Sequence, residues 1–283
     1  MTIISRPILR YHGGKWKLAP WIISHFPQHR VYTEVFGGAA SVLLQKPRSY
    51  AEVYNDTWDT VVNIFRVLRD PVAAAELRQR IELTPFARAE FDGCGEVQIR
   101  ECTDPIEKAR LTIFRSFAGF GSAATNAEHS TGFRANTTRS GTTPAHDWVN
   151  YPTHIESFTS RLRGVVIENR DYHDVFEAHD GPETLHYVDP PYVHATRNMQ
   201  RGNAAYAHEF TDDDHRELSA VLHGLSGMVV LSGYDCELYR ELFGDWGGGI
   251  RKKTHGDGAT DRIECLWLNP LCGARQKQKT LFQ

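Results

Sequence analysis

Short apolar runs alternate with amphipathic segments along the chain, and this pattern predicts both strands and helices. Apolar runs bounded by turn-forming residues predict strands at 31–35, 50–54, 164–167, 185–189, 228–232 and 263–268. Helices are predicted between them, at 39–45, 174–178, 212–223 and 236–243. This alternation is typical of an α/β sheet with helices on both faces.

The segment 58–163 has a different pattern, which is mainly helical. Its first part carries apolar residues at helical spacing, and Pro71 is expected to end or kink that helix. Further on, Asp104 and Pro105 form an N-cap and first-turn pair ahead of a second amphipathic helix.

Residues 119–144 are rich in Gly, Ser, Thr, Ala and Asn and lack the period of a helix or a strand. They predict a long loop or a weak hairpin, and a loop of that length inside a compact domain is usually functional. We therefore predict a sheet domain made of 1–57 and 164–283, with 58–163 inserted into it.

The composition is that of an ordinary globular protein, with 41% hydrophobic and 24% charged residues in a chain of 283. Collagen, coiled coil and disorder are excluded. No apolar run reaches the roughly 18 residues that cross a bilayer, and the N-terminus lacks the apolar part of a signal peptide. Five cysteines, an odd number, favour a reducing compartment over a disulfide scaffold. We expect a soluble cytoplasmic enzyme without membrane contact.

The charge is unevenly distributed around a formal net value of −3. Basic residues gather before position 34, between 108 and 139, and at 251–253. Such patches suit a protein that grips phosphates on one face, although charge runs can equally be solvated surface. If nucleic acid is the partner, the candidate contacts are Arg10, Arg115, Arg134 and Arg139.

The first candidate site follows the first predicted strand, which ends in Glu34-Val-Phe36-Gly37-Gly38. Glycines in such a turn let the backbone approach a ligand. Asp56 follows the second strand, and an acid at about this distance can accept hydrogen bonds from ribose hydroxyls. The G-x-G-x-x-G fingerprint is absent, which favours a simpler nucleoside over a dinucleotide. The glycines can equally mark an ordinary tight turn.

The sharpest motif is Asp189-Pro190-Pro191-Tyr192, at the end of an apolar strand. The two prolines prevent both strand pairing and helix. They predict a rigid extended segment at the carboxyl edge of the sheet, where α/β folds bind ligands. A carboxylate, a proline carbonyl and an aromatic ring suit an amino group on a flat ring. A proline-rich turn without chemistry is the alternative interpretation.

Four elements in this order, Tyr11-His-Gly-Gly-Lys15, Glu34-Val-Phe-Gly-Gly, Asp56 and Asp189-Pro-Pro-Tyr192, resemble the D12-class N6-adenine DNA methyltransferases, the Dam-like enzymes. The resemblance covers about 8–269. It implies a Rossmann-like, S-adenosylmethionine-dependent methyltransferase sheet with a mainly helical target-recognition insertion at 58–163. Double-stranded DNA is the implied partner.

The resemblance also implies roles for individual residues. Tyr11 and Lys15 contribute to the cofactor site, Glu34, Phe36, Gly37 and Gly38 border its methionine end, Asp56 holds the ribose, and Asp171 lies near the adenine of the cofactor. Asp189, Pro190, Pro191 and Tyr192 take a flipped target adenine, with Asp189 also beside the cofactor and the Tyr192 ring stacking on the base.

The chain departs from the family pattern in two places. Ala40 stands where many relatives have a third glycine, and the Arg-Tyr-Asn segment with which Dam helps read its target is not evident in 119–134, so GATC recognition is not implied. Histidine and cysteine spacings typical of a metal site are absent, and no obligate protein partner is evident. N4-cytosine or RNA methylation, and a catalytically inactive DNA-binding regulator, remain alternatives.

Overall fold

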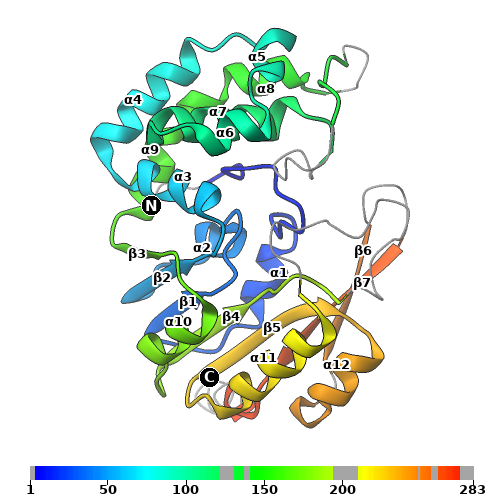
Figure 1. The fold of residues 1–283 in the computed structure, drawn as a ribbon. Helices are drawn as coiled ribbons and strands as arrows, with labels where there is room; N and C mark the ends of the chain where they lie inside the picture. The colour runs from blue at the N-terminus through cyan, green and yellow to red at the C-terminus, as the bar shows by residue number, and fades with distance from the viewer. Residues whose placement is uncertain are drawn as a thin grey trace. The chain divides into compact units, whose positions relative to one another are not determined.

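The computed structural model describes residues 4–121, 131–136, 141–193, 210–247, 249–255 and 261–274. The contacts divide the chain into two compact units (Figure 1). The first unit consists of Met1–Ala19, Gly38–Gln45 and Trp58–Asn169, and the second of Pro20–Gly37, Lys46–Thr57 and Arg170–Gln283. The predicted helical segment 58–163 falls within the first unit, which also takes in two earlier stretches of the chain.

A seven-stranded sheet has the order β3-β2-β1-β4-β5-β7-β6. The strands are β1 (Val31–Glu34), β2 (Ala51–Asn55), β3 (Val165–Glu168), β4 (Thr184–Val188), β5 (Met228–Tyr234), β6 (Ile250–His255) and β7 (Asp261–Leu268). Strand β1 pairs in parallel with β2 and β4, and β4 with β5, whereas β7 runs antiparallel to both β5 and β6. The predicted α/β class is confirmed.

Strand β6 is missing from the sequence prediction. Its first residues, 250–253, form a basic run without regular apolar alternation, a pattern that is typical of charged surface. The structure pairs Arg251 with Cys265 and Lys252 with Glu264 across the antiparallel ladder. Strand β6 is the edge of the sheet, and charged residues on an edge strand discourage pairing with another chain.

In the second unit, helices cover one face of the sheet (Figure 1). They are α10 (Tyr172–His179), α11 (Asp212–Gly224) and α12 (Glu237–Leu242), followed by the 3-10 turn η5 (Gly244–Trp246). Their apolar faces share one core with the strands, which includes Val35, Val175, Phe176, Val188, Leu218, Leu222, Val229, Leu231, Phe243 and Trp267. Because side chains alternate along a strand, neighbouring residues point to the opposite face.

The opposite face of the sheet in the second unit carries aromatic and polar side chains. Tyr32 on β1 and Tyr187 on β4 are buried there, and both rings lie about 6 Å from that of Phe26. Phe26 follows the short helix α1 (Ala19–Ser24). This face therefore holds the hydroxyl groups of two tyrosines inside the protein.

The first unit is mainly helical. Its elements are α2 (Ser41–Gln45), α3 (Asp59–Arg69), α4 (Pro71–Glu82), α5 (Arg88–Asp92), α6 (Glu96–Glu101), α7 (Pro105–Ala118), α8 (Pro144–Val149), η2 (Tyr151–His154) and α9 (Ile155–Leu162), with β3 at the end. Asp104 caps α7 by accepting from two backbone N–H groups, as predicted. Asp70 caps α4 in the same way, so Pro71 ends one helix and begins the next.

Residues 119–134 contain the beginning of a hairpin. Gly119 and Phe133 form an antiparallel bridge, and the N–H of Phe120 donates to the carbonyl of Gly132 at 2.8 Å. This agrees with the predicted loop or weak hairpin over 119–144, of which 122–130 and 137–140 lie outside the described residues.

A hydrogen-bonded group joins three strands of the second unit away from their carboxyl ends. Asp180 accepts from the backbone N–H groups of Ser226 and Gly227 at 2.8 Å and lies 3.1 Å from Nε2 of His186. His186 Nδ1 lies 2.7 Å from the Thr33 hydroxyl. Burial lowers the pKa of His186, so its ring is neutral at pH 7. The order Thr–His–Asp resembles a hydrolytic triad, but complete burial of His186 makes it a structural clamp.

We expect Asp180→Asn to lower the free energy of unfolding by about 1–2 kcal/mol at pH 7, because it weakens charge-assisted hydrogen bonds. Partial burial opposes the shift, but bonds from His186, Ser226 and Gly227 hold the pKa of Asp180 well below its usual value. The stabilisation is therefore present above about pH 4 and is lost as the pH falls through the folded-state pKa.

Urea unfolding of the wild type and Asp180→Asn at pH 7 and pH 3 measures this difference, with Glu177→Gln on the exposed side of α10 as the control. The gap between wild type and variant should narrow at pH 3. An equal gap at both pH values would show that the carboxylate charge is not the stabilising feature.

Candidate functional site

Three adjacent parallel strands of the second unit, β2, β1 and β4, end at the same edge of the sheet. Glu34 at the end of β1 is the register partner of Tyr54 on one side and of Tyr187 on the other. Asp56 and Asp189 follow directly after β2 and β4. The chain extends the sheet to one side of β1 first and to the other side later. Such a switch point is where open α/β sheets bind ligands.

The turn after β1 is held by Asn55, the last residue of β2. The Gly37 N–H donates to the Asn55 carbonyl at 2.7 Å, and the Asn55 amide donates to the carbonyls of Val35 and Arg170 at 2.9 and 3.1 Å. A Cβ at Gly37 would lie 2.2 Å from the ring of Tyr54. The position therefore requires glycine. Sequence reasoning missed the role of Asn55, because the sequence shows only an asparagine at the end of an apolar run.

Glu34 and Phe36 lie on either side of this turn. Glu34 is buried and accepts a hydrogen bond from the Tyr32 hydroxyl at 2.7 Å. The half-buried ring of Phe36 lies 5.7 Å from that of Tyr172 and 5.6 Å from that of Phe210. The turn thus presents a carboxylate and an aromatic surface at the edge of the sheet.

Asp171 lies at the start of α10, where it caps the helix. Its carboxylate accepts from the backbone N–H of His173 at 2.9 Å and lies 2.7 Å from the ring nitrogen Nδ1 of the same residue. The side chain is exposed. Its local geometry is explained by capping, so a cofactor role for Asp171 rests on the family resemblance alone.

The Asp189–Tyr192 segment follows β4 directly and is neither helix nor strand. Asp189 is half-buried, Pro190 is buried, and Tyr192 is only 5% exposed. The Tyr192 hydroxyl donates to a carboxylate oxygen of Glu264 on β7 and lies 3.3 Å from the Ser232 hydroxyl on β5. Burial, followed by the charges of Asp189 and Glu264, raises the pKa of Tyr192 well above its usual value, so its hydroxyl stays protonated.

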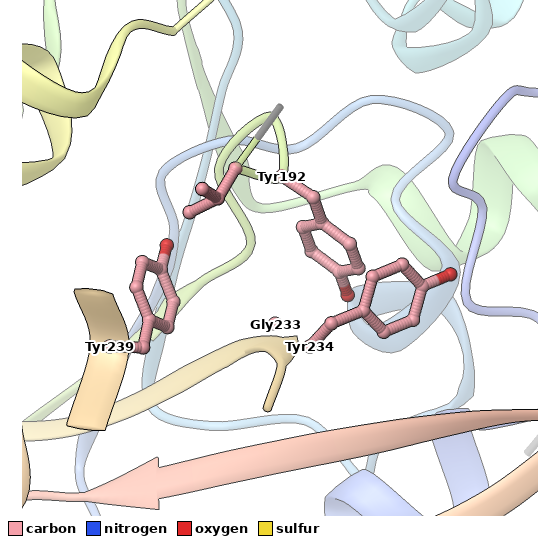
Figure 2. A pocket seen from close by; sticks show the side chains of 5 residues that line it. Tyr192, Gly233, Tyr234 and Tyr239 are labelled. Atoms are coloured by element: carbon pink, nitrogen blue, oxygen red, sulfur yellow. The ribbon is translucent and has the colours of Figure 1, made fainter. Parts of the chain in front are cut away.

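A small hollow beside Tyr192 is lined by Val193, Gly233, Tyr234 and Tyr239 (Figure 2). The rings of Tyr192 and Tyr234 meet edge to face with centroids 4.6 Å apart, and Figure 2 shows them side by side. A Cβ at Gly233 would lie 2.8 Å from the Tyr239 ring, so a larger residue there would displace this ring. Glu264 is not a candidate from sequence, because only the pairing of β5 with β7 brings it to the Tyr192 hydroxyl.

The other predicted cofactor residues belong to the first unit. Gly38 has a φ of +47°, and a Cβ there would lie 2.7 Å from the Tyr11 ring, so this glycine and Tyr11 are in direct contact. Lys15 is buried and its ammonium donates to the Gly13 carbonyl at 2.8 Å. Ala40 has a φ of +52°, a left-handed conformation that glycine adopts more readily than alanine.

The arginines predicted to contact DNA differ in their surroundings. Arg115 is buried and donates to the Cys94 carbonyl at 3.0 Å, with its guanidinium over the Phe91 ring. We infer that Arg115 supports the packing of the first unit. Arg134 is half-buried and donates to the Phe117 carbonyl at 2.9 Å. Arg10 is half-buried as well, and Arg139 lies outside the described residues.

The described part of the chain contains no group of three or more His, Cys, Asp or Glu residues placed to hold a metal ion. None of its helices is both long and apolar enough to cross a membrane.

The model of the D12 class N6 adenine-specific DNA methyltransferase family matches residues 11–255. The chain belongs to this family. The resemblance of its motifs is thereby confirmed, and the enzyme is an adenine-specific DNA methyltransferase. Family membership implies S-adenosylmethionine as the methyl donor and DNA as the substrate. A search of curated proteins found no match. The family match ends before Glu264, the acceptor of the Tyr192 hydroxyl.

Proposed function

We propose that the enzyme methylates N6 of an adenine that is flipped out of duplex DNA and held by Asp189–Tyr192. The observation that carries the proposal is the position of Asp189, a half-buried carboxylate directly beyond β4 at the switch point of the sheet. A base inside a duplex cannot reach such a site, so it must leave the stack.

The cofactor residues proposed are those of the family motifs: Tyr11, Lys15, Glu34, Phe36, Gly37, Gly38, Asp56 and, on resemblance alone, Asp171. Within the second unit, the chemistry of Glu34 and Asp56 at the ends of adjacent strands fits a ligand with ribose hydroxyls and positive charge. The bound S-adenosylmethionine supplies a methyl group on a positively charged sulfur. We assign Asp56 to the ribose and Glu34 and Phe36 to the methionine end.

The part of Asp189 follows from the weakness of the nucleophile, since the N6 lone pair is delocalised into the adenine ring. The Asp189 carboxylate and the Pro190 carbonyl accept hydrogen bonds from the two N–H groups of the adenine N6 amine. These bonds favour a more tetrahedral nitrogen with its lone pair available. Pro190 and Pro191 restrict the backbone, so the acceptors are in place before the base arrives. The residues act by position and charge, without a covalent bond to the protein.

We further propose that 58–163 recognises the DNA target, with Arg10, Arg134 and Arg139 as contacts to phosphates or bases. The basic residues of 108–139 support this assignment. Arg134 donates to the Phe117 carbonyl at the end of α7, which places this basic side chain beside the basic stretch of 108–139.

The test compares three substrates at equal nucleotide concentration: unmethylated plasmid duplex, the same DNA after denaturation, and RNA. Labelled methyl transfer should be fastest on the duplex. Once sequencing of the methylated product has located the target, 2-aminopurine at that position should gain fluorescence on binding, as expected for a base that leaves the stack. Preferred methylation of RNA, or transfer without any fluorescence gain, would contradict the proposal.

A further inference from the structure

Polar side chains lie on the face of the sheet opposite the α10–α12 core, and some of them contact Tyr192. Glu34 on β1 and Tyr187 on β4 are register partners, so they share this face. Ser232 on β5 and Glu264 on β7 lie on the same face, since their side chains are bonded to each other at 2.9 Å. Ser232 is completely buried. Burying polar side chains inside a sheet costs free energy unless they are hydrogen-bonded, so this buried polar row indicates a functional role.

Glu264 is the charged member of this row nearest to Tyr192. It is 3% exposed, and one carboxylate oxygen accepts from both the Tyr192 and the Ser232 hydroxyls. These contacts join the segment after β4 to β5 and β7. A charge-assisted bond of this kind is stronger than one between neutral groups.

The bond constrains the phenol ring at its far end. The backbone of Tyr192 is limited at the other end by Pro190 and Pro191, and the Tyr234 ring meets the Tyr192 ring edge to face. Because the phenol is held in its protonated form, it remains a donor to the carboxylate across the working pH range. The ring is therefore fixed at both ends before any ligand binds.

We propose that Glu264 is a positioning residue, which holds the Tyr192 ring in the orientation needed to stack on the target adenine. The inference rests on the proposed role of Tyr192 at the target base. It also gives the Tyr192 hydroxyl a function, whereas the sequence alone assigns one only to the ring. Ser232 is the second donor that keeps the Glu264 carboxylate in place.

Four variants test this proposal in the full-length enzyme. Tyr192→Phe removes the donor, and Glu264→Met removes the acceptor while keeping the volume. Glu264→Gln keeps an oxygen that can accept from Tyr192. The combined Tyr192→Phe/Glu264→Met variant closes a double-mutant cycle. The control is Glu52→Gln. Glu52 is also 3% exposed and accepts a hydrogen bond from Lys46, but it lies near the start of β2, away from the carboxyl end of the strand.

Steady-state transfer of a labelled methyl group to unmethylated plasmid DNA is the readout. Tyr192→Phe and Glu264→Met should each lower kcat by about tenfold, with KM for S-adenosylmethionine and DNA changed by less than about threefold. Glu264→Gln should retain most of the wild-type kcat, because its amide oxygen can still accept from the Tyr192 hydroxyl. The combined variant should be no slower than the slower single variant, because both remove the same bond. Glu52→Gln should lower the melting temperature and leave kcat unchanged.

An unchanged kcat in Tyr192→Phe would overturn the proposal, even if Glu264→Met does not fold. Multiplied losses in the combined variant would overturn it too, as would equal losses in Glu264→Gln and Glu264→Met. These results are separate from failure of the proposed function. If the wild-type enzyme binds DNA but methylates no adenine, the proposed function is wrong. If the wild type and Tyr192→Phe both methylate adenine at the same rate, only the positioning role of Glu264 is wrong.

Discussion

Asp189→Ala is expected to lower the single-turnover rate of methyl transfer by at least about a hundredfold, the usual effect of removing a preorganised electrostatic group. The carboxylate lies directly beyond β4, and no other acid follows that strand within the described residues 184–193. DNA affinity should change little, since contacts to phosphates dominate binding. Cofactor affinity is expected to fall modestly, because the carboxylate borders the positive sulfur.

The measurement uses enzyme in excess over unmethylated duplex DNA, with DNA affinity measured separately by fluorescence anisotropy. Asp189→Asn should recover part of the rate, because one acceptor oxygen remains. Asp213→Ala, an exposed acid on α11, is the control and should transfer at the wild-type rate. A near-normal rate in Asp189→Ala would refute the mechanism.

The second large effect is expected for Asp56→Ala, which should weaken S-adenosylmethionine binding by tenfold or more. Each charge-assisted hydrogen bond to a ribose hydroxyl contributes about 1.5–3 kcal/mol. Asp56 directly follows Asn55, which bonds the end of β2 to the turn after β1 and so fixes the backbone beside Asp56. Isothermal titration of the cofactor gives the affinity, and circular dichroism checks that the fold is intact.

Asp59→Ala is a suitable control for Asp56→Ala. Asp59 is an exposed acid three positions further along the chain, in the first turn of α3, where it pairs with Arg66 at 3.3 Å. Its removal should leave cofactor affinity unchanged. Equal affinities for the wild type and Asp56→Ala would remove Asp56 from the cofactor site.

The sequence predicts well those features that depend on local patterns. Short runs rich in β-branched and aromatic residues, bounded by turn-forming residues, place β1, β2, β4 and β5 to within two residues. The Asp104-Pro105 pair marks the start of α7, because its two residues supply an N-cap and a preset backbone angle. Strand β6 escapes prediction since an edge strand need not be apolar on both faces.

Partners that are distant in sequence explain the remaining differences. Glu264 lies 72 positions from Tyr192, and only the pairing of β5 with β7 brings their side chains together. Arg115 looks like a DNA contact in a basic stretch, yet the packing of α7 buries it. The charge and type of a residue are visible in the sequence, whereas its contacts with residues distant along the chain are not.

The central claim is that Asp189–Tyr192 directs a methyl group to N6 of adenine in DNA. Its most direct test is nucleoside mass spectrometry of unmethylated duplex DNA after incubation with the enzyme and methyl-deuterated S-adenosylmethionine. The wild type should produce deuterated N6-methyl-2′-deoxyadenosine, and Asp189→Ala should produce almost none. Deuterated N4-methyl-2′-deoxycytidine as the main product, or no labelled nucleoside from a folded enzyme that binds the cofactor, would contradict the claim.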